Sequence, residues 1–139
     1  MSIEPSVLLL YSDPEPFLRL EKLLENQSVP TVRVNSCQQA RTLLAQSGTP
    51  RIVLTDTTLK DGTWRDALRL TGEASLPRAV IVVNRWDDIR LYLAALDQGA
   101  FDFIAPPFLA SEVNWVLRRA QLHLAQRDKS GSKAAAAAD

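Results

Sequence analysis

The feature that most constrains the fold is a regular alternation of short apolar runs with longer segments of helical periodicity. Short apolar runs bounded by polar residues or prolines are typical of buried strands, and apolar residues spaced three or four apart are typical of amphipathic helices. Five strands alternating with five helices imply an α/β domain with a parallel sheet, right-handed crossovers and helices on both faces. The predicted strands are 6–11, 31–35, 51–55, 79–83 and 101–105.

Local signals mark the ends of the helical segments. Ser36 and Gln39 have the spacing of a capping box, so a helix is predicted to begin there. Gly48 and Gly99 follow helical stretches at positions that favour a left-handed residue. The last helix is predicted over 110–126, where apolar residues form a stripe on one side.

The chain has the length of one domain, 139 residues. We therefore predict a single folded domain over 1–126. The segment DKSGSKAAAAAD at 128–139 has no apolar period. Residues 127–139 are accordingly expected to form a disordered linker or an added tail outside the fold.

Charge and composition exclude several classes of function. Sixteen basic and sixteen acidic residues cancel, so the chain lacks the positive field that binds nucleic acid. No apolar run approaches the roughly 20 residues of a membrane-spanning helix, and no signal peptide is evident, so we expect a cytoplasmic protein. Cys37 and His123 are the single cysteine and histidine, which excludes an internal disulfide and a cysteine or histidine metal cluster.

A functional site is expected where ligands bind in open parallel sheets, outside the carboxyl ends of the strands at the point where strand order reverses. The segment SDPEP after the first strand has no glycine, which argues against a nucleotide or flavin site. The only histidine lies in the last helix, which argues against a Ser-His-Asp hydrolase. The residues delivered to this edge are Tyr11, Ser12, Asp13, Asp56, Thr57, Thr58, Asn84, Arg85, Ala105 and Pro106.

Over roughly 6–125 the chain resembles the receiver domain of bacterial two-component response regulators. The resemblance lies in the layout and in three segments, VLLLYSDPEPFLRLEKLLE, IVLTDTTLKDG and DQGAFDFIAPPF. It implies a flavodoxin-like, doubly wound sheet of strand order 2-1-3-4-5, with Asp56 at the phosphoacceptor position. It also implies a cis bond between Pro106 and Pro107.

The resemblance implies a Mg²⁺ ion held by acidic residues after the first strand, by Asp56 and by the backbone carbonyl of Thr58. A divalent ion shields the charge of a carboxylate that attacks a phosphoryl group. The family's acidic pair falls here on Tyr11 and Ser12, so Asp13 is the remaining candidate ligand, with helix capping as its alternative role. Magnesium is therefore the cofactor that the resemblance implies, with an incomplete set of acidic ligands.

Other pocket positions also depart from the family. Its hydroxyl falls on Asn84, whose amide can still donate a hydrogen bond to a phosphoryl oxygen. Its lysine falls on Pro106, which has no charge, so Arg85 is either a substitute cation or an exposed arginine. Its loop proline and glycine fall on Lys60 and Trp64, which leaves the loop geometry open.

Receivers signal through the face built from the fourth helix, the fifth strand and the fifth helix. The family's switch aromatic falls on Phe103, and three more aromatic residues are predicted at or near this face. Exposed aromatic side chains are typical of contact hot spots, and core packing is the alternative. The predicted partner face comprises Trp86, Tyr92, Phe103 and Trp115.

Three functions remain open at this point. The first is a degenerate receiver that is not an enzyme and binds a histidine kinase, an effector domain or a second copy, with weak or no phosphorylation. The second is a working receiver that phosphorylates itself on Asp56 from a phosphodonor, with a pocket rearranged around Asp13, Asn84 and Arg85. The third is an unrelated small-molecule binder on the same fold, because fold alone does not fix function.

Overall fold

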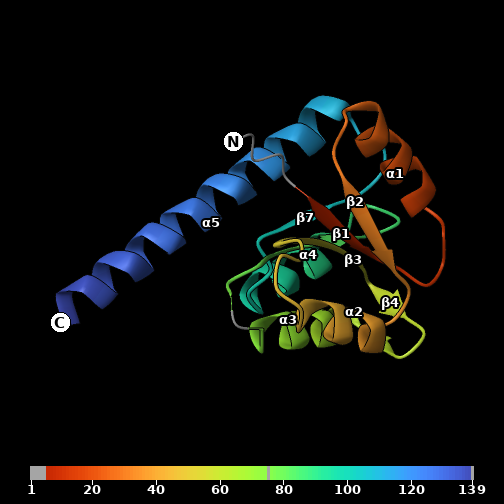
Figure 1. Ribbon diagram of the computed structural model, residues 1–139. Coiled ribbons are helices and arrows are strands. Elements are labelled where there is room, and N and C mark those ends of the chain that lie inside the picture. Colours follow the sequence, from red (N-terminus) through yellow and green to blue (C-terminus); the bar gives the residue numbers. More distant parts are fainter. Residues whose placement is uncertain (1–5, 75, 139) are drawn as a thin grey trace.

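The computed structural model describes residues 6–74 and 76–138, and their arrangement is an α/β domain around one parallel sheet (Figure 1). The spatial order of the strands is β2-β1-β3-β6-β7, with every neighbouring pair parallel. This order confirms the predicted doubly wound topology. The strands of the sheet are β1 (Val7–Leu10), β2 (Thr31–Val34), β3 (Ile52–Asp56), β6 (Ala79–Val83) and β7 (Asp102–Ile104).

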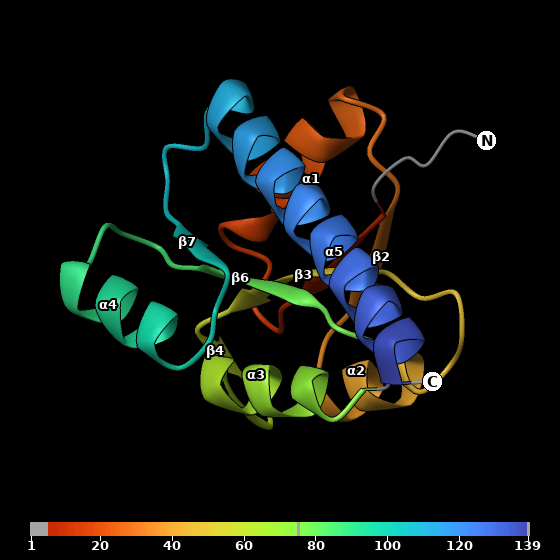
Figure 2. The ribbon, with the colours of Figure 1, turned by 90° about the vertical axis from the view of Figure 1, so that its left-hand side faces the viewer.

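Within the described residues, five helices connect and cover the strands. Helices α1 and α5 lie on one face of the sheet, α2 and α3 lie on the other, and α4 lies at the β7 edge (Figure 2). The five helices predicted from the sequence are therefore confirmed. Their bounds are α1 (Phe17–Asn26), α2 (Cys37–Leu44), α3 (Trp64–Gly72), α4 (Ile89–Asp97) and α5 (Ala110–Ala138).

The central strands are buried on both faces because their side chains point alternately into two layers of helices. Leu9 and Leu54 belong to the core beneath α1 and α5, whereas Leu8 and Leu10 belong to the core beneath α2 and α3. Each fully buried leucine stabilises the fold by roughly 1.5–3 kcal/mol. This two-sided burial holds the carboxyl ends of β1, β3 and β6 in fixed positions.

A two-stranded hairpin that is not among the predicted strands follows β3. It consists of β4 (Thr58–Leu59) and β5 (Gly62–Thr63), which pair antiparallel. A Cβ atom on Gly62 would lie 2.6 Å from Oδ2 of Asp66, so a side chain at this position would displace the carboxylate that accepts a hydrogen bond from the backbone N–H of Thr63. Thr63 and Asp66 form a capping box that begins α3 directly after the hairpin.

The last helix continues beyond its predicted end. Helix α5 runs from Ala110 to Ala138, so the predicted end of the last helix at 126 is wrong. The carboxylate of Asp128 accepts hydrogen bonds of 2.7 and 2.9 Å from Arg51, which ties α5 to the residue before β3. Figure 1 shows the C-terminal part of α5 leaving the body of the domain. Where the folded domain ends along this helix stays a prediction, and Asp139 lies outside the described residues.

Among the described residues, no helix combines the length and the apolar character needed to cross a membrane.

Candidate functional site

Asp56 is the last residue of β3 and is fully buried. Its strand lies between β1 and β6, so the loops that follow all three strands meet at its carboxylate. The backbone N–H of Thr57 donates a 2.7 Å hydrogen bond to Oδ1 of Asp56. A buried carboxylate also needs a cationic partner, because an unpaired charge in the interior is costly.

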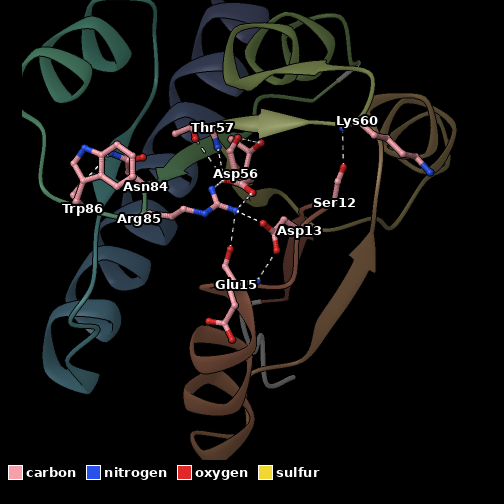
Figure 3. Close-up of polar contacts among 10 residues, drawn as sticks. Ser12, Asp13, Glu15, Asp56, Thr57, Lys60, Asn84, Arg85 and Trp86 are labelled. Atoms are coloured by element: carbon pink, nitrogen blue, oxygen red, sulfur yellow. Dashed lines mark hydrogen bonds and ion pairs between the residues drawn. The ribbon is translucent and has the colours of Figure 1, made fainter.

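Arg85 supplies that cation from the loop after β6 (Figure 3). Its Nη1 donates to Oδ1 of Asp56 at 3.1 Å and its Nη2 to Oδ2 at 3.3 Å, a bidentate arrangement. Nη2 also lies 3.1 Å from Oδ2 of Asp13 and 2.8 Å from the carbonyl oxygen of Glu15. One guanidinium therefore joins the loops after β1, β3 and β6.

The charge of Arg85 is stabilised by this arrangement. Partial burial opposes the charge, but the hydrogen bond and the charge of Asp56, helped by Asp13, outweigh it and raise the pKa of Arg85 above its ordinary value. Arginine is in any case always charged near neutral pH. The Arg85 guanidinium therefore provides the site with a positive charge that does not depend on pH near neutrality.

Asp13 faces Arg85 and does not cap α1. The N-terminal residue that caps α1 is Pro16, and no side-chain hydrogen bond is made there. Oδ1 of Asp13 instead accepts a 3.2 Å hydrogen bond from the backbone N–H of Glu15, which turns the loop after β1. The capping role considered for Asp13 is therefore wrong.

Asn84 is buried beside this site, but its amide nitrogen has a local partner. Nδ2 donates a 2.8 Å hydrogen bond to the carbonyl oxygen of Trp86, and the backbone N–H donates to Ile104 of β7. The side-chain hydrogen bond of Asn84 thus fixes the loop before α4, and the structure brings Arg85, not Asn84, to the carboxylate of Asp56.

The two positions of the family's acidic pair have structural contacts. The ring of Tyr11 stacks on Phe17 with centroids 4.6 Å apart, and its hydroxyl donates to Glu21 at 3.1 Å. Ser12 Oγ donates to the carbonyl of Asn35 and accepts from the backbone N–H of Lys60, both at 2.8 Å. Tyr11 joins β1 to α1, and Ser12 joins the ends of β1 and β2 to the hairpin.

The donor set of this site does not fit a divalent metal ion. Among the residues that the structure describes, no group of three or more His, Cys, Asp or Glu residues is placed to hold one. The two nearby acids, Asp13 and Asp56, both bind Arg85. Thr58, whose backbone carbonyl is the third predicted ligand, lies in β4. A divalent ion would have to displace the Arg85 guanidinium from both carboxylates.

The search against protein-family models found no match. The fold, however, is shared with solved receiver domains. A signal receiver domain of an HD domain-containing protein from Pseudomonas fluorescens Pf-5 superposes with a TM-score of 0.74 and 23% identity, over 89% of this chain and 99% of that one. A response regulator receiver domain from Clostridium thermocellum gives a TM-score of 0.71 at 20% identity, over 84% and 93% of the two chains. This chain has the receiver fold.

Two curated relatives of this receiver-fold chain carry the same name, photosynthetic apparatus regulatory protein RegA. The protein from Cereibacter sphaeroides is 31% identical over 111 residues, which cover 79% of this chain and 60% of the relative. The protein from Rhodovulum sulfidophilum is 28% identical over 115 residues, covering 82% and 62%. The chain thus spans less than two thirds of the relatives it matches.

Two further expectations for the receiver fold have clear outcomes. The bond between Pro106 and Pro107 is cis, as predicted. Trp64, at the family's glycine position, begins α3 and is buried against Val82, Ala95 and Phe103. This indole fills space between the sheet and α4 that a glycine would leave empty.

Of the four residues predicted for the partner face, only the two tryptophans are well exposed in this receiver fold. Trp86 and Trp115 are 62% and 61% exposed. Phe103 is buried, and the half-buried Tyr92 packs edge-on against it with ring centroids 5.8 Å apart. The prediction that Phe103 is a surface contact is therefore wrong. Trp115 lines a shallow hollow with Val29, on the side of α5 next to the segment between α1 and β2.

Asp61 is a positioning residue that the sequence did not reveal. Its carboxylate accepts hydrogen bonds from the backbone N–H groups of Cys37 at 2.8 Å and Gln38 at 3.0 Å, at the N-terminus of α2. These bonds lower the pKa of Asp61, the bond from Cys37 most strongly. Ser36 caps the same helix through Gln39, as predicted. The hairpin after β3 is thereby fixed to α2.

Replacement of Asp61 by alanine is expected to lower the free energy of unfolding by about 1 kcal/mol at neutral pH, because a carboxylate leaves the helix N-terminus. Since the pKa of Asp61 is lower in the folded chain, its contribution is fully present above the unfolded value, near 3.9, and declines as the pH falls through the folded value. Urea unfolding of wild type and variant at several pH values measures the difference. A difference that persists at a pH below both values would contradict this account.

Proposed function

We propose that this chain is an atypical receiver domain of two-component, or phosphorelay, signal transduction in the cytoplasm, which acts by binding other proteins with weak or no phosphorylation of Asp56. The observation that carries the proposal is the bidentate ion pair between Arg85 and Asp56. The receiver fold and the likeness to the RegA regulatory proteins support a signalling role. The expected partners are a histidine kinase, an effector domain or a second copy of the chain.

The ion pair opposes phosphorylation because it occupies the nucleophile. Phosphoryl transfer requires a carboxylate oxygen to approach phosphorus in line with the leaving group. Oδ1 of Asp56 already accepts hydrogen bonds from Thr57 and Arg85, and Oδ2 accepts from Arg85. A phosphodonor would have to displace the guanidinium, which Asp13 and the Glu15 carbonyl also hold.

A working receiver is the second candidate, and the same residue gives it support. A guanidinium binds phosphoryl oxygens well, so Arg85 in front of Asp56 is also suited to stabilise a phosphoryl group. The two candidates differ in the role of Arg85. In the first it blocks Asp56, and in the second it assists the transfer to Asp56.

Incubation with a small acyl phosphate and magnesium, followed by measurement of intact mass, separates the two candidates. We expect wild type to gain little or no phosphoryl group, and Arg85→Met to gain at least as much as wild type. Asp56→Asn identifies any increment that depends on Asp56. Arg118→Ala, which removes an exposed arginine on α5, is the control for loss of one positive charge.

A large increment in wild type that is lost in both Arg85→Met and Asp56→Asn would overturn the blocked pocket. It would establish the working receiver, with Arg85 as the residue that binds the transferred group.

A further inference from the structure

A hollow lined by two arginines lies at the edge of the sheet opposite to Asp56. It is formed by the C-terminal turn of α3, the segment that enters β6, the turn between α4 and β7, and α5. Its volume is about 330 Å³, near the lower end of the range for small-molecule sites. The amino end of β6 lies roughly 16 Å from its carboxyl end, which is level with Asp56. The hollow is therefore separate from the site at Asp56.

Arg78, the residue before β6, is half-buried at this hollow, and neutral acceptors hold its guanidinium. Nε donates to the carbonyl oxygen of Pro50 at 3.3 Å, Nη1 to that of Leu76 at 3.1 Å, and Nη2 to Oγ1 of Thr49 at 2.9 Å. A guanidinium has five N–H donors, so one N–H remains on each terminal nitrogen. The three bonds fix the guanidinium without neutralising its charge.

Among the described residues, the charge of Arg78 has no acidic partner. Partial burial lowers the pKa of Arg78 below its ordinary value, and the charge of Arg51 lowers it further. Arg51 differs because Asp128 accepts two hydrogen bonds from it and raises its pKa. Arg78 is still charged near neutral pH, so an anion beside it would offset both unfavourable effects.

Arg127 of α5 adds a second positive charge to the lining of the hollow. It is exposed, and it forms no ion pair with any residue that the structure describes. The acids that adjoin lining residues in the chain, Glu73, Asp97 and Asp128, do not line the hollow, and Glu73 forms an ion pair with Arg41. Within the described part of the chain, the lining therefore carries two positive charges and no negative one.

The rest of the lining is suited to an apolar group. Leu68, Pro77 and Val80 contribute apolar side chains, and Gln98 contributes an amide. Small-molecule sites are typically lined by apolar side chains, with a few polar groups that fix the orientation of the ligand. The combination of cationic and apolar groups favours a ligand with an anionic group on an apolar body.

We propose that this hollow binds a small organic anion, with a carboxylate or phosphate group on a compact apolar body. Arg78 donates two N–H groups to oxygens of the anionic group, since the planar guanidinium matches such oxyanions. Arg127 adds a second charge from α5, and Leu68 and Val80 contact the apolar body. The site goes beyond the protein-binding role proposed above, because a ligand there joins the segment before β6 to α5.

Titration of the full chain, followed by proton–nitrogen correlation NMR spectra at constant ionic strength, tests the site. The probes are phenyl phosphate and benzoate. We expect saturable shifts of the backbone amides of Thr71, Gly72 and Gly99, with a Kd of about 1 mM for the tighter probe. Which probe binds more tightly identifies phosphate or carboxylate as the preferred group. The amide of Thr57, which donates to Asp56, is the internal reference and should not shift.

Removal of either arginine is expected to weaken binding of the probes. Arg78→Gln should weaken it at least about tenfold, because charge-assisted hydrogen bonds are lost. Arg127→Ala should weaken it about threefold, because an exposed charge contributes less. Arg78→Gln also removes contacts to Thr49 and Pro50, whereas Arg127→Ala removes charge without them. Arg118→Ala is the matched control, because Arg118 is an exposed arginine of α5 that does not line the hollow.

Several results would overturn the proposal. One is the absence of saturable shifts at Gly99 with either probe up to about 20 mM. Another is equal weakening by Arg127→Ala and Arg118→Ala. Larger shifts at Thr57 than at Gly99 would locate the anion beside Arg85 instead. Inorganic phosphate that binds in the hollow as tightly as phenyl phosphate would make it a site for an adventitious ion only.

Discussion

Replacement of Arg85 by methionine is expected to lower the free energy of unfolding by about 3 kcal/mol at neutral pH. The variant leaves the carboxylate of Asp56 fully buried and without its cationic partner. The loss should fall toward the lower end of the range for broken buried pairs, because the Arg85 side chain is itself partly exposed to water. Equilibrium urea unfolding, followed by circular dichroism, measures the change.

Replacement of Asp56, the other member of the pair, is expected to lower the free energy of unfolding by less. Asp56→Asn keeps hydrogen-bonding atoms in place and leaves Arg85 bound to Asp13 and Glu15, so we expect a loss of about 1 kcal/mol. The double variant should be more stable than Arg85→Met alone, because it removes the unpaired charge. A loss below about 0.5 kcal/mol for Arg85→Met would be typical of a surface arginine and would contradict the buried pair.

Replacement of Trp64 by glycine is expected to lower the free energy of unfolding by about 4 kcal/mol. The indole is buried and packs against Val82, Ala95 and Phe103, so its removal leaves a large cavity between the sheet and α4. Glycine adds a further cost in backbone entropy at the first residue of α3. Urea unfolding gives the stability, and near-ultraviolet circular dichroism reports the packing of the remaining aromatic rings.

Trp86→Ala is the control for Trp64→Gly, because Trp86 is exposed and its loss should change the stability by less than about 0.5 kcal/mol. If Trp64→Gly is destabilised by less than about 1 kcal/mol, the loop after β3 closes over the space without a large side chain. That result would contradict a space-filling role of the indole between the sheet and α4.

The sheet and the place of Asp56 were predictable because they depend on apolar periodicity. A run such as 79–83 has no polar residue and is compatible only with burial on both sides, and the strand before Asp56 ends where its apolar residues end. The hairpin of β4 and β5 was missed because strands of two residues have no period to detect. The end of α5 was misplaced because a mixed polar and alanine-rich stretch has helical propensity without an apolar stripe.

The site itself was less predictable because it depends on side-chain direction. An arginine after a strand carries no sequence signal for turning inward, so the sequence left Arg85 as either a substitute cation or an exposed residue. Its bidentate contact with Asp56 depends on three loops meeting in space. Phe103 was placed on the surface by resemblance, whereas the edge-on packing of Tyr92 and the indole of Trp64 keep it buried.

The guanidinium that faces Asp56 is covalently tethered to the chain, and this has a consequence for how the domain senses its surroundings. A dissociable ion occupies a site according to its concentration in the cell, whereas a tethered group has a high effective concentration that dilution does not change. Arg85 remains beside Asp13 and Asp56 whatever the supply of free ions. A free cation can therefore bind these carboxylates only in competition with a cationic group that is always present.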